Sequence, residues 1–255
     1  MEIIDAHIHL DSYEENTRTE IINSIYKDGL KAIITVSMNL ISCKQNLQLS
    51  KENKGIYPAF GFHPEQKLPA ESEINELFKW IRENNNEMIA IGEVGLPYYL
   101  KQDNEVDYVP YLELLERFII LSNELNKPII LHAVYEDADI VCDLLEKHSI
   151  KKAHFHWFKG SNQTIKRMIQ NGYYISITPD VLYENEIQEL VKDYPLHLMM
   201  VETDGPWPFE GPFTGDWTHP KFIHDSIQKI AELKKMDIVK VYHQLYENSQ
   251  FFYGV

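Results

Sequence analysis

The chain has 255 residues, of which 44% are hydrophobic and 25% are charged, the balance of a water-soluble globular protein. This length is enough for one large barrel or for two ordinary domains, and no apolar run approaches the roughly 20 residues that cross a membrane. The net charge of −15 argues against a broad non-specific nucleic-acid surface, but it leaves room for a nucleic-acid substrate whose phosphates meet metal ions.

Short runs rich in isoleucine, valine, tyrosine and methionine recur along the chain at the spacing of β–α units. In chain order, they predict eight strands, at residues 2–7, 31–37, 57–62, 88–93, 128–132, 152–156, 173–177 and 197–202. Between them lie amphipathic stretches in which apolar residues recur at helical spacing. The residues on these faces are Ile74, Leu77, Phe78 and Ile81, then Leu114, Phe118, Leu121 and Leu125, then Ile223, Ile227 and Ile230.

Eight β–α units in about 250 residues predict an α/β fold, a TIM-type (β/α)8 barrel. A doubly wound sheet is the alternative, because periodicity does not report whether a sheet closes. No low-complexity linker or change of composition divides the sequence, so we expect residues 1–255 to form a single domain.

Histidines and carboxylates gather at the predicted C-terminal ends of the strands, where such barrels place their active sites. His7 and His9 point to the same side of the first strand, because side chains alternate along a strand. Further candidates follow at the ends of later strands: His63, Glu93, His132, His154, His156, Glu202 and Asp204. His154 shares a face with His156 and is an alternative ligand, but we expect it to lie one layer deeper in the barrel and to be hydrogen-bonded.

The donor types fit a pair of divalent ions. Imidazole and carboxylate suit Zn²⁺ or Mn²⁺, and carboxylate with water also suits Mg²⁺. Six groups are too many for one catalytic zinc with an open position: His7, His9, Glu93, His132, His156 and Asp204. They suit two ions bridged by a carboxylate, about 3.5–4 Å apart, which hold a hydroxide nucleophile. A carboxylate at the site then accepts the proton of the attacking water.

Five motifs, in the order of the chain, resemble those of TatD-type metal-dependent deoxyribonucleases of the amidohydrolase-like superfamily. They are Asp5-Ala6-His7-Ile8-His9, Gly61-Phe62-His63-Pro64, Gly92-Glu93-Val94-Gly95-Leu96, His156-Trp157-Phe158-Lys159-Gly160-Ser161 and Glu202-Thr203-Asp204-Gly205-Pro206. The resemblance implies a (β/α)8 barrel that hydrolyses phosphodiester bonds, in DNA or a related substrate, with two divalent ions (Mg, Mn or Zn).

The resemblance also implies a role for each matching residue. His7, His9 and Asp204 hold the first ion, and Glu93 bridges the two. His132 and His156 hold the second ion. His63 contacts substrate phosphate, and Asp204 serves in addition as the general base.

Three positions depart from the pattern of that family. Pro97 stands where the family has aspartate, Val134 stands where it has arginine, and Thr218-His219-Pro220 replaces Asn-x-Pro. Valine cannot replace the bidentate phosphate contact of a guanidinium, so Lys159 is the candidate for a substitute charge in substrate binding. A metal-dependent amidohydrolase or lactonase that acts on a small molecule is therefore an alternative function. A non-catalytic barrel is a further one, against which the six intact ligand positions argue.

Several neighbouring residues have supporting interpretations. Asp5 is expected on the same face of its strand as His7, and Glu202 on the same face as Asp204. Both are therefore expected to point inward and to orient ligands. Glu65 is expected to cap a helix or to face solvent. The aromatics of the loop from Trp207 to Phe213 either stack on a substrate ring or pack against the barrel rim.

The two cysteines, Cys43 and Cys142, lie far apart and are expected to be inert thiols in a reducing compartment. Because no basic-then-apolar leader opens the sequence, we expect a cytoplasmic protein. No feature indicates a membrane or an obligate protein partner.

Overall fold

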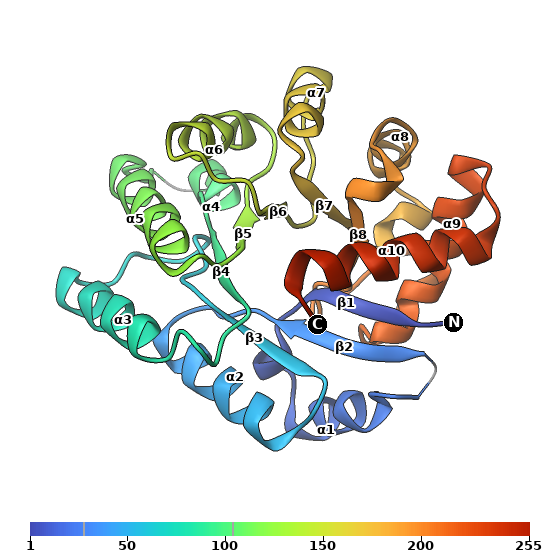
Figure 1. The fold of residues 1–255 in the computed structure, drawn as a ribbon, viewed down its shortest axis with the longest axis horizontal. Coiled ribbons are helices and arrows are strands. Elements are labelled where there is room, and N and C mark those ends of the chain that lie inside the picture. The colour runs from blue at the N-terminus through green and yellow to red at the C-terminus, as the bar shows by residue number, and fades with distance from the viewer. Residues whose placement is uncertain (28, 104) are drawn as a thin grey trace.

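The computed structural model describes residues 1–27, 29–103 and 105–255, and it contains one eight-stranded parallel sheet in the order β1 to β8 (Figure 1). The strands are β1 Ile3–Ile8, β2 Leu30–Thr35, β3 Ile56–Phe60, β4 Ala90–Gly95, β5 Ile129–His132, β6 Ala153–Phe155, β7 Tyr174–Ile177 and β8 Met199–Val201. All eight predicted strands are confirmed, and no boundary differs from its predicted position by more than two residues.

The first and last strands meet through hydrogen bonds made just beyond the end of β8. The amide of Asp204 donates to the carbonyl oxygen of His7 at 2.9 Å, and the amide of His9 donates to the carbonyl oxygen of Gly205 at 2.8 Å. The amide of Thr203 donates to the Asp5 carboxylate at 3.0 Å. These bonds bring β8 back to β1, so the sheet forms a barrel and the doubly wound alternative is wrong.

Helices surround the sheet in Figure 1. They are α1 Glu15–Ser24, α2 Leu40–Glu52, α3 Glu71–Glu83, α4 Tyr98–Asp103, α5 Val109–Leu125, α6 Glu136–Lys147, α7 Asn162–Asn171, α8 Asn185–Asp193, α9 Ile223–Lys234 and α10 Ile238–Tyr253. Short 3₁₀ turns occur at Leu10–Ser12, Pro179–Leu182, Leu196–Leu198, Gly211–Phe213 and Pro220–Phe222. In the described ranges, no helix has the length and apolarity that a membrane crossing requires.

The predicted apolar faces bury against the strands. All four predicted residues of α3 are buried, as are the three of α9; in α5 Leu125 is only partly buried. Local signals fix the helix ends: the Asn39 side chain accepts two amide protons at the start of α2, and Gly172 ends α7 in the left-handed conformation, at φ 73°. Apolar periodicity therefore accounts for the buried faces of α3, α5 and α9, and local capping accounts for the ends of α2 and α7.

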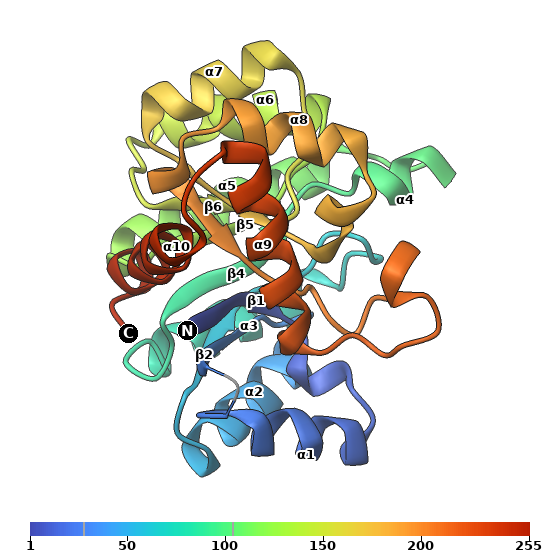
Figure 2. The same cartoon turned by 90° about the vertical axis from the view of Figure 1, so that its right-hand side faces the viewer.

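The interior of the barrel has its own small apolar cluster, which contains Ile4, Ala32, Ile34 and Met200. Phe252 and Tyr253, at the end of α10, complete this cluster. Figure 2 shows α10 at one end of the barrel and the loop that follows β8 at the opposite end. The C-terminal ends of the strands thus remain free to carry a site.

Candidate metal centre

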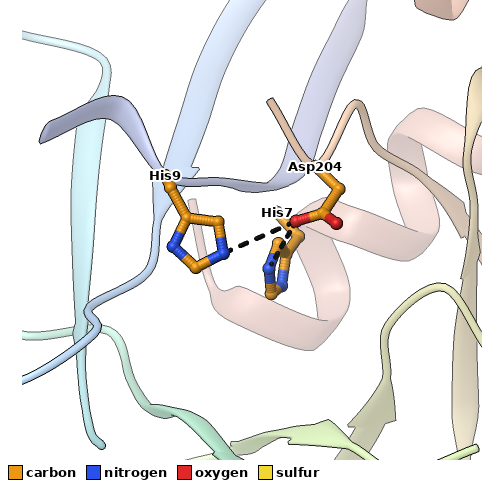
Figure 3. Close-up of side chains that lie close together, drawn as sticks. All are labelled: His7, His9 and Asp204. Atoms are coloured by element: carbon orange, nitrogen blue, oxygen red, sulfur yellow. Dashed lines mark ion pairs between the residues drawn. The ribbon is translucent and has the colours of Figure 1, made fainter. Parts of the chain in front are cut away.

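Three of the predicted ligands converge where β1 meets the segment after β8 (Figure 3). Nε2 of His7 lies 3.2 Å from Oδ1 of Asp204, and Nε2 of His9 lies 3.5 Å from the same oxygen. Asp204 adopts the left-handed backbone region, at φ 49°, which non-glycine residues rarely visit. This sharp turn directly after β8 aims its carboxylate back at the two imidazoles.

The Glu93 carboxylate lies at the centre of the cluster, with one oxygen on each side. Oε2 lies 3.2 Å from Nε2 of both His7 and His9. Oε1 lies 2.6 Å from Nε2 of His156 and 3.0 Å from Nδ1 of His132. One carboxylate therefore faces two separate pairs of imidazoles, the arrangement expected of a group that bridges two ions.

Close packing of β4 and β5 brings Glu93 and His132 together. A Cβ atom at Gly95 would lie 1.9 Å from the carbonyl oxygen of His132, closer than any side chain tolerates. Only glycine therefore permits this approach of the two strand ends. The Gly-Glu-Val-Gly motif has a steric role in addition to supplying the carboxylate.

Buried charge at the centre is compensated by the imidazoles. Burial opposes ionisation of Glu93, but His156, His63 and His7 outweigh it and hold the pKa of the carboxyl well below its usual range. Burial likewise opposes protonation of His156, but Glu93 and Glu202 hold the pKa of that imidazole well above its usual value. The buried Glu93 carboxylate is therefore stable only with positive charge beside it. Protonated imidazoles supply that charge without metal, and divalent ions would supply it when the imidazoles are neutral ligands.

The polar atoms of the cluster fit a metal because several lack hydrogen-bond partners despite full burial. Both ring nitrogens of His7 and of His9, Oε2 of Glu93 and Oδ1 of Asp204 are such atoms. Buried polar groups are normally satisfied, and each exception calls for an explanation. Ligand atoms of these residues lie within 4.8 Å of one another, both in the set His7, His9 and Asp204 and in the set Glu93, His132 and His156. The structure thus brings all six predicted ligands together, and their role as ligands stays a prediction.

Two further carboxylates hold the ligands in place. Asp5 accepts hydrogen bonds from the amide and the hydroxyl of Thr203, at 3.0 and 2.5 Å, and so fixes the backbone next to Asp204. Glu202 accepts the Trp157 amide at 2.8 Å, and its Oε1 lies 3.7 Å from Nδ1 of His156. Both residues support the surroundings of a ligand, as expected, but simple alternation does not relate Asp5 to His7, because the register of β1 shifts between Asp5 and Ile8.

His154 lies below this layer, as predicted. Its Nδ1 lies 2.7 Å from the Tyr253 hydroxyl, and its Nε2 lies 2.6 Å from the Ser176 hydroxyl. Ser176 donates in turn to Glu202 at 2.5 Å. A hydrogen-bonded chain therefore runs from α10 through the barrel interior to the residue beside His156.

Glu65 departs from its expected role in part. Its carboxylate accepts the amides of Tyr99 and Leu100, at 2.9 and 2.6 Å, so it does cap the start of α4. It also lies 3.1 Å from Nε2 of His132, on the ring edge opposite Glu93. Donation of Nε2–H to Glu65 leaves the Nδ1 lone pair of His132 free to face Glu93. Glu65 lies in the loop five residues beyond the end of β3, and no local sequence pattern points to this contact with His132.

The two predicted substrate contacts differ in position. His63 lines the pocket above the cluster, and its Nδ1 accepts the Glu65 amide at 3.2 Å, so its Nε2 carries the proton in the neutral ring. Nε2 lies 3.6 Å from Oε1 of Glu93. Lys159 is not among the lining residues, and its ammonium lies 5.7 Å from the centre of the Trp157 ring, beside the pocket.

The pocket above the cluster has a volume of about 350 Å³. Sequence reasoning missed two of its aromatic walls, Tyr99 and Trp157, because nothing in their local pattern separates them from rim residues. Trp207 also lines the pocket, whereas Phe209 and Phe213 are buried against Phe222. The loop after β8 thus realises both open alternatives: two phenylalanines pack, and one tryptophan faces the pocket.

Comparisons with known proteins agree with this geometry. The profile of the family described as "TatD related DNase" matches residues 4–254. A protein of Haemophilus influenzae named "uncharacterized metal-dependent hydrolase" is 41% identical over 254 residues, which cover 98% of this chain and 99% of that protein. Human deoxyribonuclease TATDN3 is 26% identical over 97% of this chain and 93% of its own.

The fold has a solved counterpart. The crystal structure of YJJV, a TatD homologue from Escherichia coli, superposes with a TM-score of 0.87 and 22% identity. The match covers 99% of this chain and 98% of that one, so the whole barrel is shared.

Proposed function

The chain belongs to the TatD-related DNase family, and from that premise we propose that this metal-dependent hydrolase cleaves phosphodiester bonds with two divalent ions. The observation that carries the proposal is the Glu93 carboxylate, which presents one oxygen to His7 and His9 and the other to His132 and His156. A structural carboxylate in a barrel core has no need of four imidazoles around it.

Each ion has a set of residues that would hold it. His7, His9, Asp204 and Oε2 of Glu93 would hold the first. Oε1 of Glu93, His132 and His156 would hold the second, with His132 acting through Nδ1. Mixed imidazole and carboxylate donors suit Zn²⁺ and Mn²⁺, and Mg²⁺ suits the carboxylate-rich side.

Divalent ions in such a site lower the pKa of water and stabilise negative charge on a phosphate oxygen. The residues of the chain supply the rest of the chemistry. Asp204 faces His7 and His9 with Oδ1, so its second carboxylate oxygen would accept the proton of the attacking water. His63 lines the pocket and carries its proton on Nε2, from which it would donate to a phosphate oxygen. Burial lowers the pKa of His63 well below its usual value, which keeps it a neutral donor.

A small-molecule amidohydrolase or lactonase is the second candidate. One observation favours it: among the described residues that line the pocket, none is lysine or arginine, and Val134 occupies the wall beside His132. A polymer held by its phosphates would need cationic groups there. The two free buried thiols fit a reducing compartment, and we propose a cytoplasmic location on that basis.

The test compares Glu93→Gln and Asp204→Asn with the wild-type enzyme after reconstitution with Mg²⁺, Mn²⁺ or Zn²⁺. We expect each variant to stay folded and to lose metal-dependent turnover of single-stranded DNA and of bis(p-nitrophenyl) phosphate. Glu71→Gln, on the exposed surface of α3, is the matched control and keeps full turnover. Wild-type turnover in either site variant, or fewer than two ions bound per chain, contradicts the proposal. Preferential turnover of lactones or cyclic amides selects the second candidate.

A further inference from the structure

The pocket above the metal centre has two chemically different sides. Imidazoles and carboxylates form its floor, as described above. Tyr99, Val134, Trp157 and Trp207 form walls of a different kind, which are largely apolar. The floor accounts for the hydrolytic chemistry, and the proposed function assigns no role to the aromatic walls.

The aromatic residues come from alternate strands around the barrel. Tyr99 follows β4, Trp157 follows β6 and Trp207 follows β8. Because the strands succeed one another in the order β1 to β8, the ends of β4 and β8 lie across the barrel from each other. Tyr99 and Trp207 therefore flank the pocket from opposite sides, with Trp157 between them.

Two of these rings are exposed although their backbones are firmly held. Tyr99 is 45% exposed and Trp207 is 47% exposed. The Tyr99 amide is bound by Glu65 at 2.9 Å, and the Trp207 carbonyl oxygen accepts a short hydrogen bond from the Thr218 hydroxyl. Exposed aromatic rings on an anchored backbone offer a stacking surface for which the cost of ordering the backbone is already met.

The charges around the pocket do not favour a polyanion. The Lys159 ammonium lies over the Trp157 ring at 5.7 Å, and that of Lys101 lies 3.8 Å from the carboxylates of Glu136 and Asp137. With a net charge of −15 on the whole chain, a run of phosphates gains little from this surface. A volume of about 350 Å³ fits one ring with its sugar, and it is too small for a duplex.

We propose that, given the proposed phosphodiester hydrolysis, this pocket selects its substrate by a planar ring next to the scissile ester, stacked against Tyr99 and Trp207. The substrate class is a nucleotide at the end of a strand or in a short fragment, or another phosphodiester that carries an arene. Affinity then depends on one ring and changes little with the length of the chain of phosphates.

The test uses the metal-loaded enzyme and four dinucleotides. They are thymidylyl-thymidine, two analogues in which the 5′ or the 3′ base is replaced by hydrogen, and the phenyl replacement of the more sensitive base. We expect loss of one base to raise KM about 5- to 150-fold, the range of one base–aromatic stack, and we expect phenyl to restore most of the lost affinity. If the low KM requires thymine and phenyl does not restore it, the pocket is a nucleobase site. If phenyl restores the KM of the parent dinucleotide, the pocket accepts arenes in general. Both outcomes support the inference.

Protein variants supply the matching arm. Trp207→Leu and Tyr99→Leu should raise KM for thymidylyl-thymidine. They should not change KM for the analogue that lacks the base on which the wild-type KM depends. Trp217→Leu, 41% exposed and outside the pocket lining, is the control and should change neither. If removal of the 5′ base and removal of the 3′ base both leave KM unchanged, the inference is overturned. It is also overturned if KM falls steeply with oligonucleotide length and rises with salt.

A binding measurement separates this inference from the proposed function. Titration of the metal-free protein with thymidine 5′-phosphate should quench tryptophan fluorescence in the wild type and in Trp217→Leu, and much less in Trp207→Leu. If none of the dinucleotides is hydrolysed, the proposed function fails, and this titration alone decides whether the ring site exists. Equal quenching in the wild type and in Trp207→Leu overturns it.

Discussion

Replacement of Glu65 by alanine should weaken one of the two proposed metal positions and spare the other. Its carboxylate accepts three hydrogen bonds, from the Tyr99 amide at 2.9 Å, the Leu100 amide at 2.6 Å and Nε2 of His132 at 3.1 Å. Burial opposes its charge, but His132 and the two amides outweigh it and lower the pKa of the carboxyl. The carboxylate is therefore charged near neutral pH and held in one geometry.

The size of the effect follows from what the alanine variant loses. Without Glu65, the His132 ring has no acceptor for Nε2–H, so it is free to rotate or to exchange its proton between the two nitrogens. Loss of such a supporting group typically costs 10- to 100-fold in metal affinity, which corresponds to about 1.4–2.7 kcal/mol. His7 and His9 do not contact Glu65, so the ion that they hold should keep its affinity.

The assay is a competition titration of Zn²⁺ or Mn²⁺ against a chromophoric chelator, fitted for two dissociation constants. In parallel, ¹⁵N shifts of the His132 ring report its tautomer in the metal-free protein. Glu65→Gln retains one acceptor oxygen and should fall between the wild type and the alanine variant, and Glu71→Ala serves as the surface control. Two unchanged dissociation constants with an unchanged tautomer would refute the reasoning.

Three other predictions concern buried polar groups. Tyr253→Phe removes the hydroxyl 2.7 Å from Nδ1 of His154, so we expect the free energy of unfolding to fall by about 2 kcal/mol and Tm to fall by roughly 4–8 °C, as measured by calorimetry. Burial raises the pKa of the Cys43 and Cys142 thiols to about 12, so neither should react with Ellman's reagent at pH 8 until guanidinium unfolds the chain; rapid native reaction contradicts this. Burial also raises the pKa of Asp137 above 3.8, so the folded form holds its proton more tightly and stability falls as the pH rises from about 4. The stability of Asp137→Asn relative to the wild type, measured by urea unfolding, should therefore increase as the pH is raised from 4.5 to 7.5. A difference that stays constant would show that Asp137 does not titrate in this range.

The strands and the ligand cluster were predictable because both depend on short-range patterns. Alternation along β1 places His7 and His9 on one side, and the rule that barrel sites lie at strand ends brings Glu93 and His156 to the same region. The structure confirms that these side chains meet, within 3.2 Å of one another in the closest pairs.

The supporting contacts were not predictable in the same way. Glu65 meets His132 across 67 residues of sequence, and His154 meets Tyr253 across 99. Neither pair has a sequence signature, because the contact arises from the height of each side chain in the barrel and from the path of a loop or a C-terminal helix. The aromatic walls were uncertain for the same reason, since only tertiary packing decides that Trp207 faces the pocket and Phe209 does not.

The junction between β1 and β8 has a consequence for biosynthesis. Asp5 and its partner Thr203 are 198 residues apart, and on the ribosome, at about 5–20 residues per second, the second follows the first after roughly 10–40 s. During that interval β1 has no neighbour on one side, and His7 and His9 lack Asp204. The nascent chain therefore exposes an unpaired strand edge, the kind of surface that chaperones protect. The complete metal centre can therefore form only after β8 and Asp204 have been synthesised.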